Sequence, residues 1–239
     1  MEKSESGSPV HRYNLSDKNE FAGASGESSM EEIADHIEKH IGEIHKVFHE
    51  LVSDQVHIDV YWVKPTKEKP FHTLVSSGMS DKPMHTPEAV EGCDYAELSI
   101  CLPEDWKLSE EHFKDENNYW PLRWLKIMAR FPHEYNSWLS YGHTIPNGDP
   151  AEPFAENTQM TTIALLPSII LGEEFSTLKL ENKSIDFYTL IPLYSEEVNL
   201  KMKSGIEALF DGFDKHGVTD ILQVDRPNTV KRKKLFGLF

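Results

Sequence analysis

Histidine is the residue type in this chain that most readily suggests chemistry. The 239-residue sequence contains 12 histidines, and two pairs, His36 with His40 and His45 with His49, are four residues apart. On a helix this spacing places both imidazoles on one face, where they can bind one zinc ion. Neither pair carries the glutamate of an HExxH motif or a recognisable third ligand. We therefore interpret them as core and surface histidines and predict no metal site.

Serine hydrolase chemistry is the second option. Residues 76–80 (Ser-Ser-Gly-Met-Ser) follow a predicted strand, but they lack the GxSxG spacing that exposes a nucleophilic serine. His143 and Asp149 could complete a triad, although nothing in the sequence brings them together. The sequence contains no GxGxxG or GxxxxGKS/T motif, so no phosphate-binding loop is indicated. We predict no catalytic residue and no cofactor; a hydrolase that uses His143 or His133 in a cleft is the alternative.

The charge balance of the chain is strongly acidic. Lys and Arg number 24 against 40 Asp and Glu, which gives a formal net charge of −16. Such a surface repels phosphate backbones, so the sequence disfavours direct nucleic-acid binding and favours a basic protein as partner. The two cysteines form no CxxC motif, no apolar run reaches the roughly 20 residues of a membrane span, and the N-terminus lacks a secretory signal. These features predict a reduced, cytoplasmic protein with no membrane span.

Apolar periodicity predicts three helices, over residues 30–51, 119–139 and 195–214. Pro132 should kink or break the second helix, and Gly217 should stop the third. A long loop over residues 140–158 separates the second helix from the next strands. Alternation of apolar and polar residues predicts strands near residues 56–62, 71–77, 95–102, 160–167, 175–180 and 185–191, with a further strand near 218–224.

The order helix, strands, helix, strands, helix indicates a mixed α/β (α+β) fold. We expect a single sandwich-like domain, residues 30–228, with a mixed β-sheet flanked by helices. Residues 1–29 are rich in Ser, Gly and Glu and are predicted to form a disordered tail. Residues 229–239 form a basic-aromatic C-terminal tail, which could dock on its own domain, contact an anionic membrane weakly or bind a partner groove.

Aromatic residues gather around the second predicted helix and the loop that follows it. Most of them are expected to pack in the core. A partly exposed subset would be an anchor set of the kind enriched at protein interfaces. The aromatic set comprises Trp106, Tyr119, Trp120, Trp124, Tyr135, Trp138 and Tyr141.

An ordered series of short motifs runs through most of the chain. They include 59–63 (DVYWV), 71–81 (FHTLVSSGMSD), 95–98 (YAEL), 129–133 (ARFPH), 142–146 (GHTIP), 191–194 (IPLY) and Arg226. As a set, over roughly residues 30–228, they resemble the suppressor of fused family, in its short bacterial-type single-domain form. The resemblance implies a mixed α/β domain that binds proteins and has no catalytic motif. Some bacterial members resemble immunity proteins or antitoxins, so it also implies neutralisation of a toxin by direct binding.

The sequence thus favours a non-enzymatic domain that binds another protein, with a basic toxin as one candidate partner. Binding residues usually lie on loops held by a rigid scaffold. We predict two such loops as partner-facing, although a packed structural role for the 142–144 loop and a self-associating structural protein are alternatives. The predicted contact residues are Met79, Ser80 and Asp81 in one turn, and Tyr141, His143, Thr144 and Asn147 in the long loop.

Overall fold

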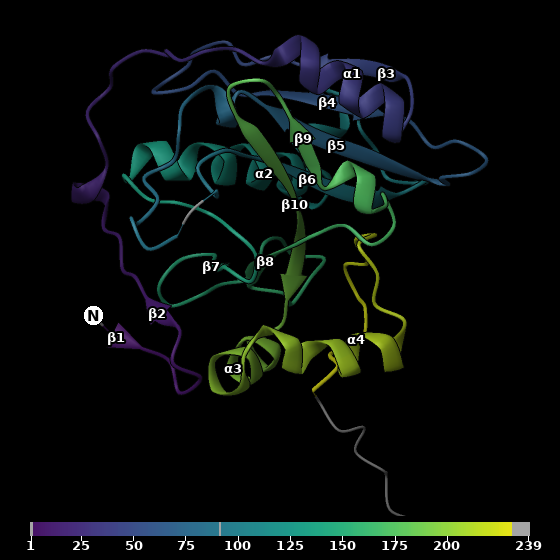
Figure 1. The fold of residues 1–239 in the computed structure, drawn as a ribbon. Helices are drawn as coiled ribbons and strands as arrows, with labels where there is room; N and C mark the ends of the chain where they lie inside the picture. Colours follow the sequence, from purple (N-terminus) through teal and green to yellow (C-terminus); the bar gives the residue numbers. More distant parts are fainter. Residues whose placement is uncertain (1, 91, 231–239) are drawn as a thin grey trace, which may run out of the picture.

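The structure is a computed structural model that describes residues 2–90 and 92–230 (Figure 1). Its central feature is an eight-stranded mixed sheet with the strand order β3-β4-β5-β6-β10-β8-β7, in which β9 also pairs with β10. A separate ribbon of β1 (Glu2–Lys3) and β2 (Pro9–Val10) lies near the N-terminus. The sheet strands are β3 (Ile44–Phe48), β4 (Asp59–Val63), β5 (Phe71–Ser77), β6 (Ala96–Pro103), β7 (Thr144–Pro146), β8 (Thr162–Leu166), β9 (Thr177–Lys179) and β10 (Ser184–Leu193).

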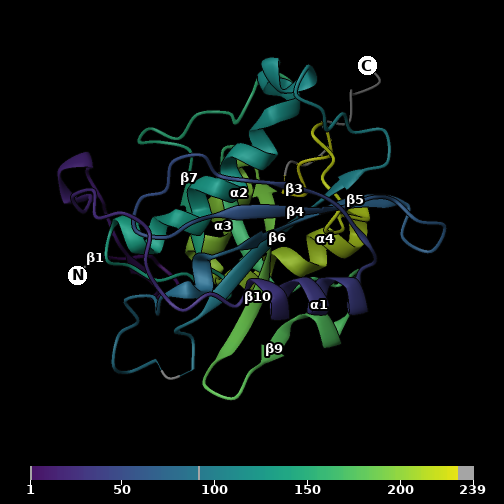
Figure 2. The same ribbon diagram turned by 90° about the horizontal axis from the view of Figure 1, so that it is seen from above.

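Helices and short 3-10 turns connect and cover the strands (Figures 1 and 2). The α-helices are α1 (Met30–His40), α2 (Glu116–Glu134), α3 (Ser195–Ser204) and α4 (Phe210–His216). The 3-10 turns are η1 (Leu15–Asp17), η2 (Met79–Asp81), η3 (His112–Lys114), η4 (Glu173–Phe175) and η5 (Ile206–Leu209).

One parallel strand pair joins two antiparallel halves of the sheet. β3 to β6 pair antiparallel in sequence order, and β10 pairs antiparallel with β8 and β9. β10 runs parallel to β6, with Phe187 opposite Glu97. A parallel pair needs a long crossover, and here the chain between the two strands supplies α2, the 140–158 loop, β7, β8 and β9.

Both faces of the first half of the sheet are buried, each under its own helix. α2 packs against β5 and β6, and its Trp120 and Leu125 belong to a core with Trp62 and other strand residues. α1 covers the opposite face, where Ile33 and Ile37 meet Tyr61 and its neighbours. Adjacent residues of β4 therefore point into different cores, as period-two geometry requires. A third core lies beneath η5 and α4.

The predicted mixed α/β fold and its six main strands are confirmed, but the helix predicted over residues 30–51 is wrong beyond His40. The chain turns at Gly42, and the next residues form the edge strand β3. Ile44 and Phe48 misled the prediction, because a spacing of four residues fits a helical face and one face of a strand equally well.

The other two predicted helices also differ in detail. α2 begins earlier than expected, with Asp115 accepting a hydrogen bond from the Asn117 amide at its N-cap, and it continues unbroken through Pro132. Pro132 lies in the last turn, so the helix ends soon after it and needs no break. The third helix is interrupted at Gly205 (φ +90°), whereas the predicted stop at Gly217 is confirmed by its left-handed conformation.

Two sequence expectations concern the C-terminal part of the chain. The strand predicted near residues 218–224 is reduced to a single bridge between Ile221 and Cys101. The 229–239 tail lies mostly outside the described residues, which end at 230. Among the described residues, no helix has the length and apolar character needed to cross a membrane.

The predicted division into a 1–29 tail, a 30–228 domain and a 229–239 tail stays a prediction. In the structure, residues 2–29, which we call the N-terminal segment, lie along the domain surface in an extended path (Figure 1). Backbone amides of this segment donate to the domain at several points along its length, three of which follow. The bonds are Ser6 N to Met202 O (3.0 Å), Asn19 N to Glu134 O (2.7 Å) and Glu27 N to Asp81 O (2.8 Å).

Gly78 offers a direct test of how β5 packs against the preceding chain. Its φ is +111°, and an added Cβ would lie 1.8 Å from the carbonyl oxygen of His57. We expect Gly78→Ala to lower the free energy of unfolding by more than about 2 kcal/mol, from backbone strain and overpacking together. Gly217→Ala, at φ +65° with no atom within 4 Å of the added Cβ, should cost only about 1 kcal/mol. Equal losses in urea unfolding would contradict the close approach to His57.

Candidate functional site

The turn after β5 is tied to β6 by a buried carboxylate. Glu97 is fully buried, and it accepts hydrogen bonds from the Ser76 and Ser80 hydroxyls and from the backbone amides of Gly78 and Ser80. Burial raises the pKa of Glu97, and these hydrogen bonds oppose that shift. The Ser-Ser-Gly-Met-Ser sequence therefore supplies donors for an internal acid.

This buried carboxylate bears on part of the predicted contact set. Met79 and Ser80 are both 0% exposed, so their side chains face the interior of the domain, and their role as contact residues stays a prediction. The donors of the turn point inward to Glu97, and Met79 fills the core beneath α2. Asp81 is half-buried, and burial raises its pKa while Lys183 opposes the shift. Its role as a contact residue stays a prediction.

The second predicted loop is held against β8, at one end of the sheet. The Gly142 amide donates to Leu165 O (2.8 Å), and the Leu165 amide donates to His143 O (3.0 Å). Within the described residues, β7 is the terminal strand on this side, so one side of its backbone has no strand partner. Asn147 closes the loop, because its side-chain amide donates to the carbonyls of Glu152 and Pro153.

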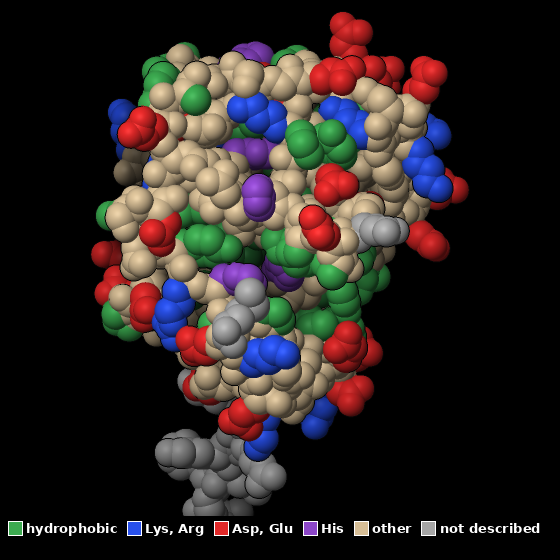
Figure 3. Space-filling view, turned by 60° about the vertical axis from the view of Figure 1, so that its left-hand side comes forward, with side chains coloured by type: hydrophobic (Ala, Val, Ile, Leu, Met, Phe, Trp, Pro, Cys, Tyr) green, Lys and Arg blue, Asp and Glu red, His purple; other side chains and the backbone are tan. Residues whose placement is uncertain are grey.

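We use the name β7 face for five residues around the start of β7. The His143 ring contacts Trp138, Lys201 donates to Thr144, and Tyr141 lies two residues before His143 in the loop. The five residues are Trp138, Tyr141, His143, Thr144 and Lys201. Tyr141 is 42% exposed. The His143 ring packs edge-on against Trp138, with 4.4 Å between centroids. The side of the molecule that carries β2 and β7 in Figure 1 comes forward in Figure 3, where histidine and hydrophobic side chains line a hollow.

Burial controls the titration of this face. It lowers the pKa of His143 to about 4, and the nearby Lys201 charge acts in the same direction. Burial also raises the pKa of Tyr141, whose hydroxyl donates to Glu207 at 3.4 Å. His143 is therefore neutral and Tyr141 keeps its proton at neutral pH, so the face offers aromatic surface and hydrogen bonds.

The N-terminal segment crosses close to this face. The Tyr13 hydroxyl lies 2.7 Å from the Ser137 hydroxyl, and its ring packs against Phe131 and Tyr135. Arg12 reaches Asp149 at 3.3 Å. These contacts place residues 12–13 beside the loop that leads into β7.

The predicted histidine and triad candidates do not assemble into a hydrolase site. Nε2 of His133 lies 2.8 Å from the Met79 carbonyl oxygen, and burial lowers the pKa of His133. His143 packs on Trp138, and the exposed Asp149 contacts Arg12. Within the described residues, no hydrogen bond or ion pair joins His143, Asp149 and a serine.

The two histidine pairs have separate surroundings. His36 is buried in α1 with Nε2 3.0 Å from the Phe175 carbonyl oxygen, whereas His45 lies in β3 and packs edge-on against Trp62. The His45 and His49 spacing therefore belongs to a strand and the turn after it. Over residues 2–90 and 92–230, no group of three His, Cys, Asp or Glu side chains is placed to hold a metal ion.

A Ser–His–Asp chain that the sequence reasoning missed does occur, at the end of β3. Ser53 Oγ lies 2.6 Å from His57 Nδ1, and His57 Nε2 lies 3.0 Å from Asp59 Oδ1. In serine hydrolases it is Nε2 that faces the serine, so this arrangement is reversed. Asp59 is also held by His49 and by the Glu50 amide. We interpret this series of hydrogen bonds as a structural link between the turn after β3 and β4. The Ser-x-x-x-His-x-Asp spacing in the sequence could have indicated it.

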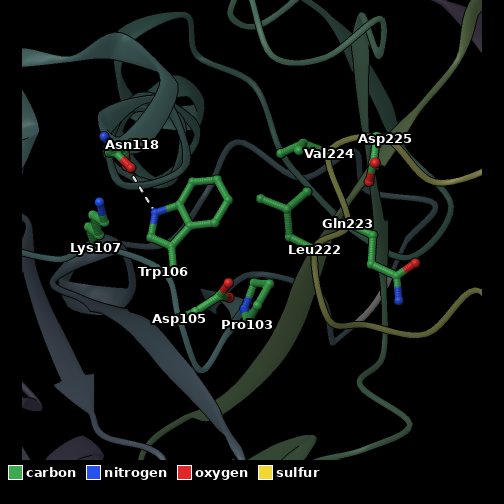
Figure 4. Close-up of a pocket in the computed structure, with 9 residues that line it drawn as sticks. All are labelled: Pro103, Asp105, Trp106, Lys107, Asn118, Leu222, Gln223, Val224 and Asp225. Carbon is green, nitrogen blue, oxygen red and sulfur yellow. Dashed lines mark hydrogen bonds between the residues drawn. The ribbon is translucent and has the colours of Figure 1, made fainter.

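The aromatic set divides between the core and the surface. Trp120 and Trp124 are buried beneath the sheet, whereas Trp138 is half-buried and Tyr141 is exposed. Trp106 is also half-buried, and its indole donates to the Asn118 carbonyl at 3.0 Å. Trp106 lines a pocket of about 340 Å³ between the end of β6 and residues 222–225, where Figure 4 shows the indole beside Leu222.

The fold and this site define a mixed α/β domain with an aromatic face beside an edge strand. The family model described as suppressor of fused protein (SUFU) matches residues 54–227. The chain belongs to the suppressor of fused family, and the resemblance drawn from its motifs is confirmed. A search of curated proteins found no match.

Solved structures share the fold at low sequence identity. A crystal structure of a SUFU homologue from Neisseria gonorrhoeae FA 1090 aligns with a TM-score of 0.60 and 20% identity, covering 85% of this chain and 97% of that one. The Sufu-Fu complex aligns with a TM-score of 0.59 and 15% identity, covering 86% and 93%. Drosophila Suppressor of Fused aligns with a TM-score of 0.59 and 16% identity over 87% of this chain and 52% of that one. The present chain thus spans about half of the Drosophila protein.

The depressed pKa of His143 predicts a loss of stability in mild acid. An ordinary histidine binds its proton near pH 6.5, whereas folded His143 does so near 4. Between these values the unfolded state binds more protons, so the free energy of unfolding falls as the pH drops. The full shift corresponds to at most about 3 kcal/mol at pH 4.

His143→Gln should therefore flatten the pH dependence of urea unfolding between about 6.5 and 4. Part of the dependence will persist, because burial lowers the pKa of His36, His72 and His133 in the same way. Exposed His85→Gln is the matched control and should leave the profile unchanged. A His143→Gln profile that overlays the wild type would contradict the burial of this imidazole.

Proposed function

We propose that this chain is a non-enzymatic protein-binding domain and that the β7 face is its contact surface. The observation that carries the proposal is the exposed Tyr141, set beside half-buried Trp138 and His143 at an edge strand. Family membership supports a binding role, since a related Sufu has been solved in complex with Fu.

The geometry favours an extended partner segment that adds to β7. Edge strands pair readily with another chain through main-chain hydrogen bonds, while side-chain pockets give specificity. β3, at the other end of the sheet, has an irregular register between Ile44 and Lys46 and exposes Lys46, two features that discourage pairing. β7 (Thr-Ile-Pro) carries no charged side chain. Because it is only three residues long and Pro146 has no N–H, the added segment would form few main-chain hydrogen bonds with it, and side-chain contacts must supply most of the affinity. Tyr141 and Trp138 then serve as aromatic anchors beside the added strand.

Charge directs the choice of partner. A net charge of −16 attracts a basic protein and speeds its encounter. Together with the resemblance to short bacterial forms, this supports an immunity or antitoxin role, in which the domain neutralises a basic toxin in the cytoplasm. The mechanism is occlusion: the bound domain covers the toxin surface and performs no chemistry itself.

Substitution of Tyr141 tests the contact surface. The tagged chain is used to capture partners from a lysate of its source organism, and the protein identified is then purified for calorimetric titration. Tyr141→Ala should weaken binding by about tenfold or more, as loss of an aromatic anchor does. Leu51→Ala, at a 97% exposed apolar residue in the turn after β3, the strand at the opposite end of the sheet, is the matched control and should bind as the wild type does. Equal affinities for the two variants would refute the assignment of the β7 face.

Co-expression tests the immunity role. The reading frame adjacent to the gene for this chain is expressed alone and together with it. We expect growth arrest from the neighbouring product alone and rescue when the chain is present, because stoichiometric binding occludes the toxin. Tyr141→Ala should reduce rescue. A neighbour that is harmless on its own would count against the immunity role and leave the wider binding proposal to the titration.

A further inference from the structure

Lys201 is a buried cation without an acidic partner. It lies in α3 and is 8% exposed. Its ammonium nitrogen donates to Thr144 Oγ1 at 3.2 Å. Across the described parts of the chain it forms no salt bridge with a carboxylate, and burial lowers the pKa of Lys201 with no acid opposing the shift. Within the described residues, Thr144 accepts from one of its three N–H donors, and the other two have no protein acceptor.

This arrangement is costly, and the other buried cation of the described domain is paired. Removing an ammonium from water costs several kcal/mol unless a counter-charge and further hydrogen bonds replace the lost solvation. Buried Arg226 is paired with Glu197 at 2.6 Å and also donates to the Pro192 carbonyl. Half-buried Lys126 donates to the Phe48 carbonyl, and burial lowers the pKa of Lys126 while the charge of Glu50 opposes the shift. Lys201 has no such opposing acid. In a chain with 40 acidic residues, an unpaired buried lysine stands out.

The position of Lys201 connects it to the β7 face. Its hydrogen-bond acceptor, Thr144, is the first residue of β7. Its charge also contributes to the lowered pKa of His143, so the two side chains are electrostatic neighbours. A positive site thus lies directly beside the strand edge to which a partner segment would add. Since 8% of Lys201 is still in contact with solvent, the residue is not sealed inside the domain.

We propose that Lys201 is an anion-recognition residue, whose ammonium binds an Asp or Glu side chain of the partner segment that adds along β7. This inference rests on the proposed function and names the chemistry that the partner must present. A carboxylate at this place would accept the two unused N–H donors, and the low dielectric around them would make the ion pair stronger than one at the surface. An interior acidic side chain fits better than a chain terminus, because a segment lying along an edge strand continues past it in both directions.

Removal of the charge gives a signature that a structural lysine would not give. In Lys201→Met an apolar side chain of similar length replaces a desolvated ammonium, so the partner-free protein should become more stable. We expect its Tm to rise by about 2–4 °C or more, the change typical of small stabilisations in a domain of this size. Lys18→Met is the control, and its Tm should not rise, because Lys18 is paired with Glu134 at 2.9 Å. A lower Tm for Lys201→Met would overturn the inference. If that variant does not fold, Lys201→Gln replaces it in this experiment and in the two that follow.

A small carboxylate probe tests the site without any partner. N-acetyl-aspartyl amide at tens of millimolar should raise the Tm of the wild type more than sodium chloride of equal ionic strength, since a ligand bound only to the folded state stabilises it. The increment should vanish in Lys201→Met and persist in Lys18→Met. N-acetylglycine, which mimics a chain terminus, should stabilise less. If N-acetylglycine raised the Tm as much or more, the assignment to an acidic side chain would be overturned. If N-acetyl-aspartyl amide raised the Tm of the wild type and of Lys201→Met equally, the anion site itself would be overturned.

Binding measurements with the captured partner separate this inference from the proposed function on which it rests. With the captured partner, Lys201→Met should lose affinity by tenfold or more, whereas Lys201→Arg, which keeps the charge, should retain part of it. Loss of binding in Tyr141→Ala with full affinity in Lys201→Met refutes the role of Lys201 and leaves the β7 face intact. Failure of the wild type to retain any partner refutes the proposed function. The carboxylate probe and the Tm of Lys201→Met then decide the anion site by themselves.

Discussion

The parallel pairing of β6 with β10 is the constraint on which the rest of the structure depends. It joins two antiparallel half-sheets that are formed by distant parts of the chain. At the last residue pair of its register, the hydroxyls of Ser99 and Thr189 lie 2.8 Å apart, and both residues are fully buried. Parallel pairing brings no local hairpin to hold the register, so a buried polar contact of this kind helps to define which residues face each other. β8 and β7 are built outward from β10, so the β7 face inherits its position from this pair.

Buried acids secure the loops around that frame. Glu97 on β6 holds the turn after β5. Asp220 accepts from the Ser168 hydroxyl and from the amides of Ile169 and Ile170. Glu197 pairs with Arg226 and accepts from the Thr229 amide. Several residues of the motifs that resemble the family are therefore internal ties. Such ties are costly to break, because each leaves a buried charge or donor unpaired, and so the motifs report the fold more directly than the binding surface.

The sequence predicted the strands well because their two-residue alternation is a local signal. Val60 and Trp62 point to one core and Tyr61 to the other, as the pattern required. The helix over 30–51 failed at Ile44 and Phe48, whose spacing does not distinguish a helix from a strand. The site was only partly predictable. Ser80 and Tyr141 are both polar residues in turns, and the acceptor that draws Ser80 inward lies on β6, 17 residues away.

Lys201 could not be predicted from the sequence either, because the contact that distinguishes it is also made with a residue distant in the chain. In the sequence it is one charged residue on an exposed helix pattern, and nothing local indicates that β7 comes to lie against it. The Ser53, His57 and Asp59 tie differs, because its residues are close in sequence and only their hydrogen bonds required the fold. Local sequence patterns thus predicted the secondary-structure elements. Burial and pairing across the sheet determine which side chains form internal hydrogen bonds and which remain available for binding.

Two electrostatic effects of opposite sign act at the β7 face, and they act over different distances. In the proposed function, the net charge of −16 would attract a basic partner from solution, but salt screens that field beyond about 8–10 Å, so it would select by charge alone. The buried Lys201 is felt only at contact, where the surrounding protein screens it weakly. A basic protein that lacks a carboxylate at the right place would be attracted and then would leave the ammonium unpaired. Long-range attraction therefore sets how often partners arrive, and the cost of an unpaired buried charge sets which of them stay.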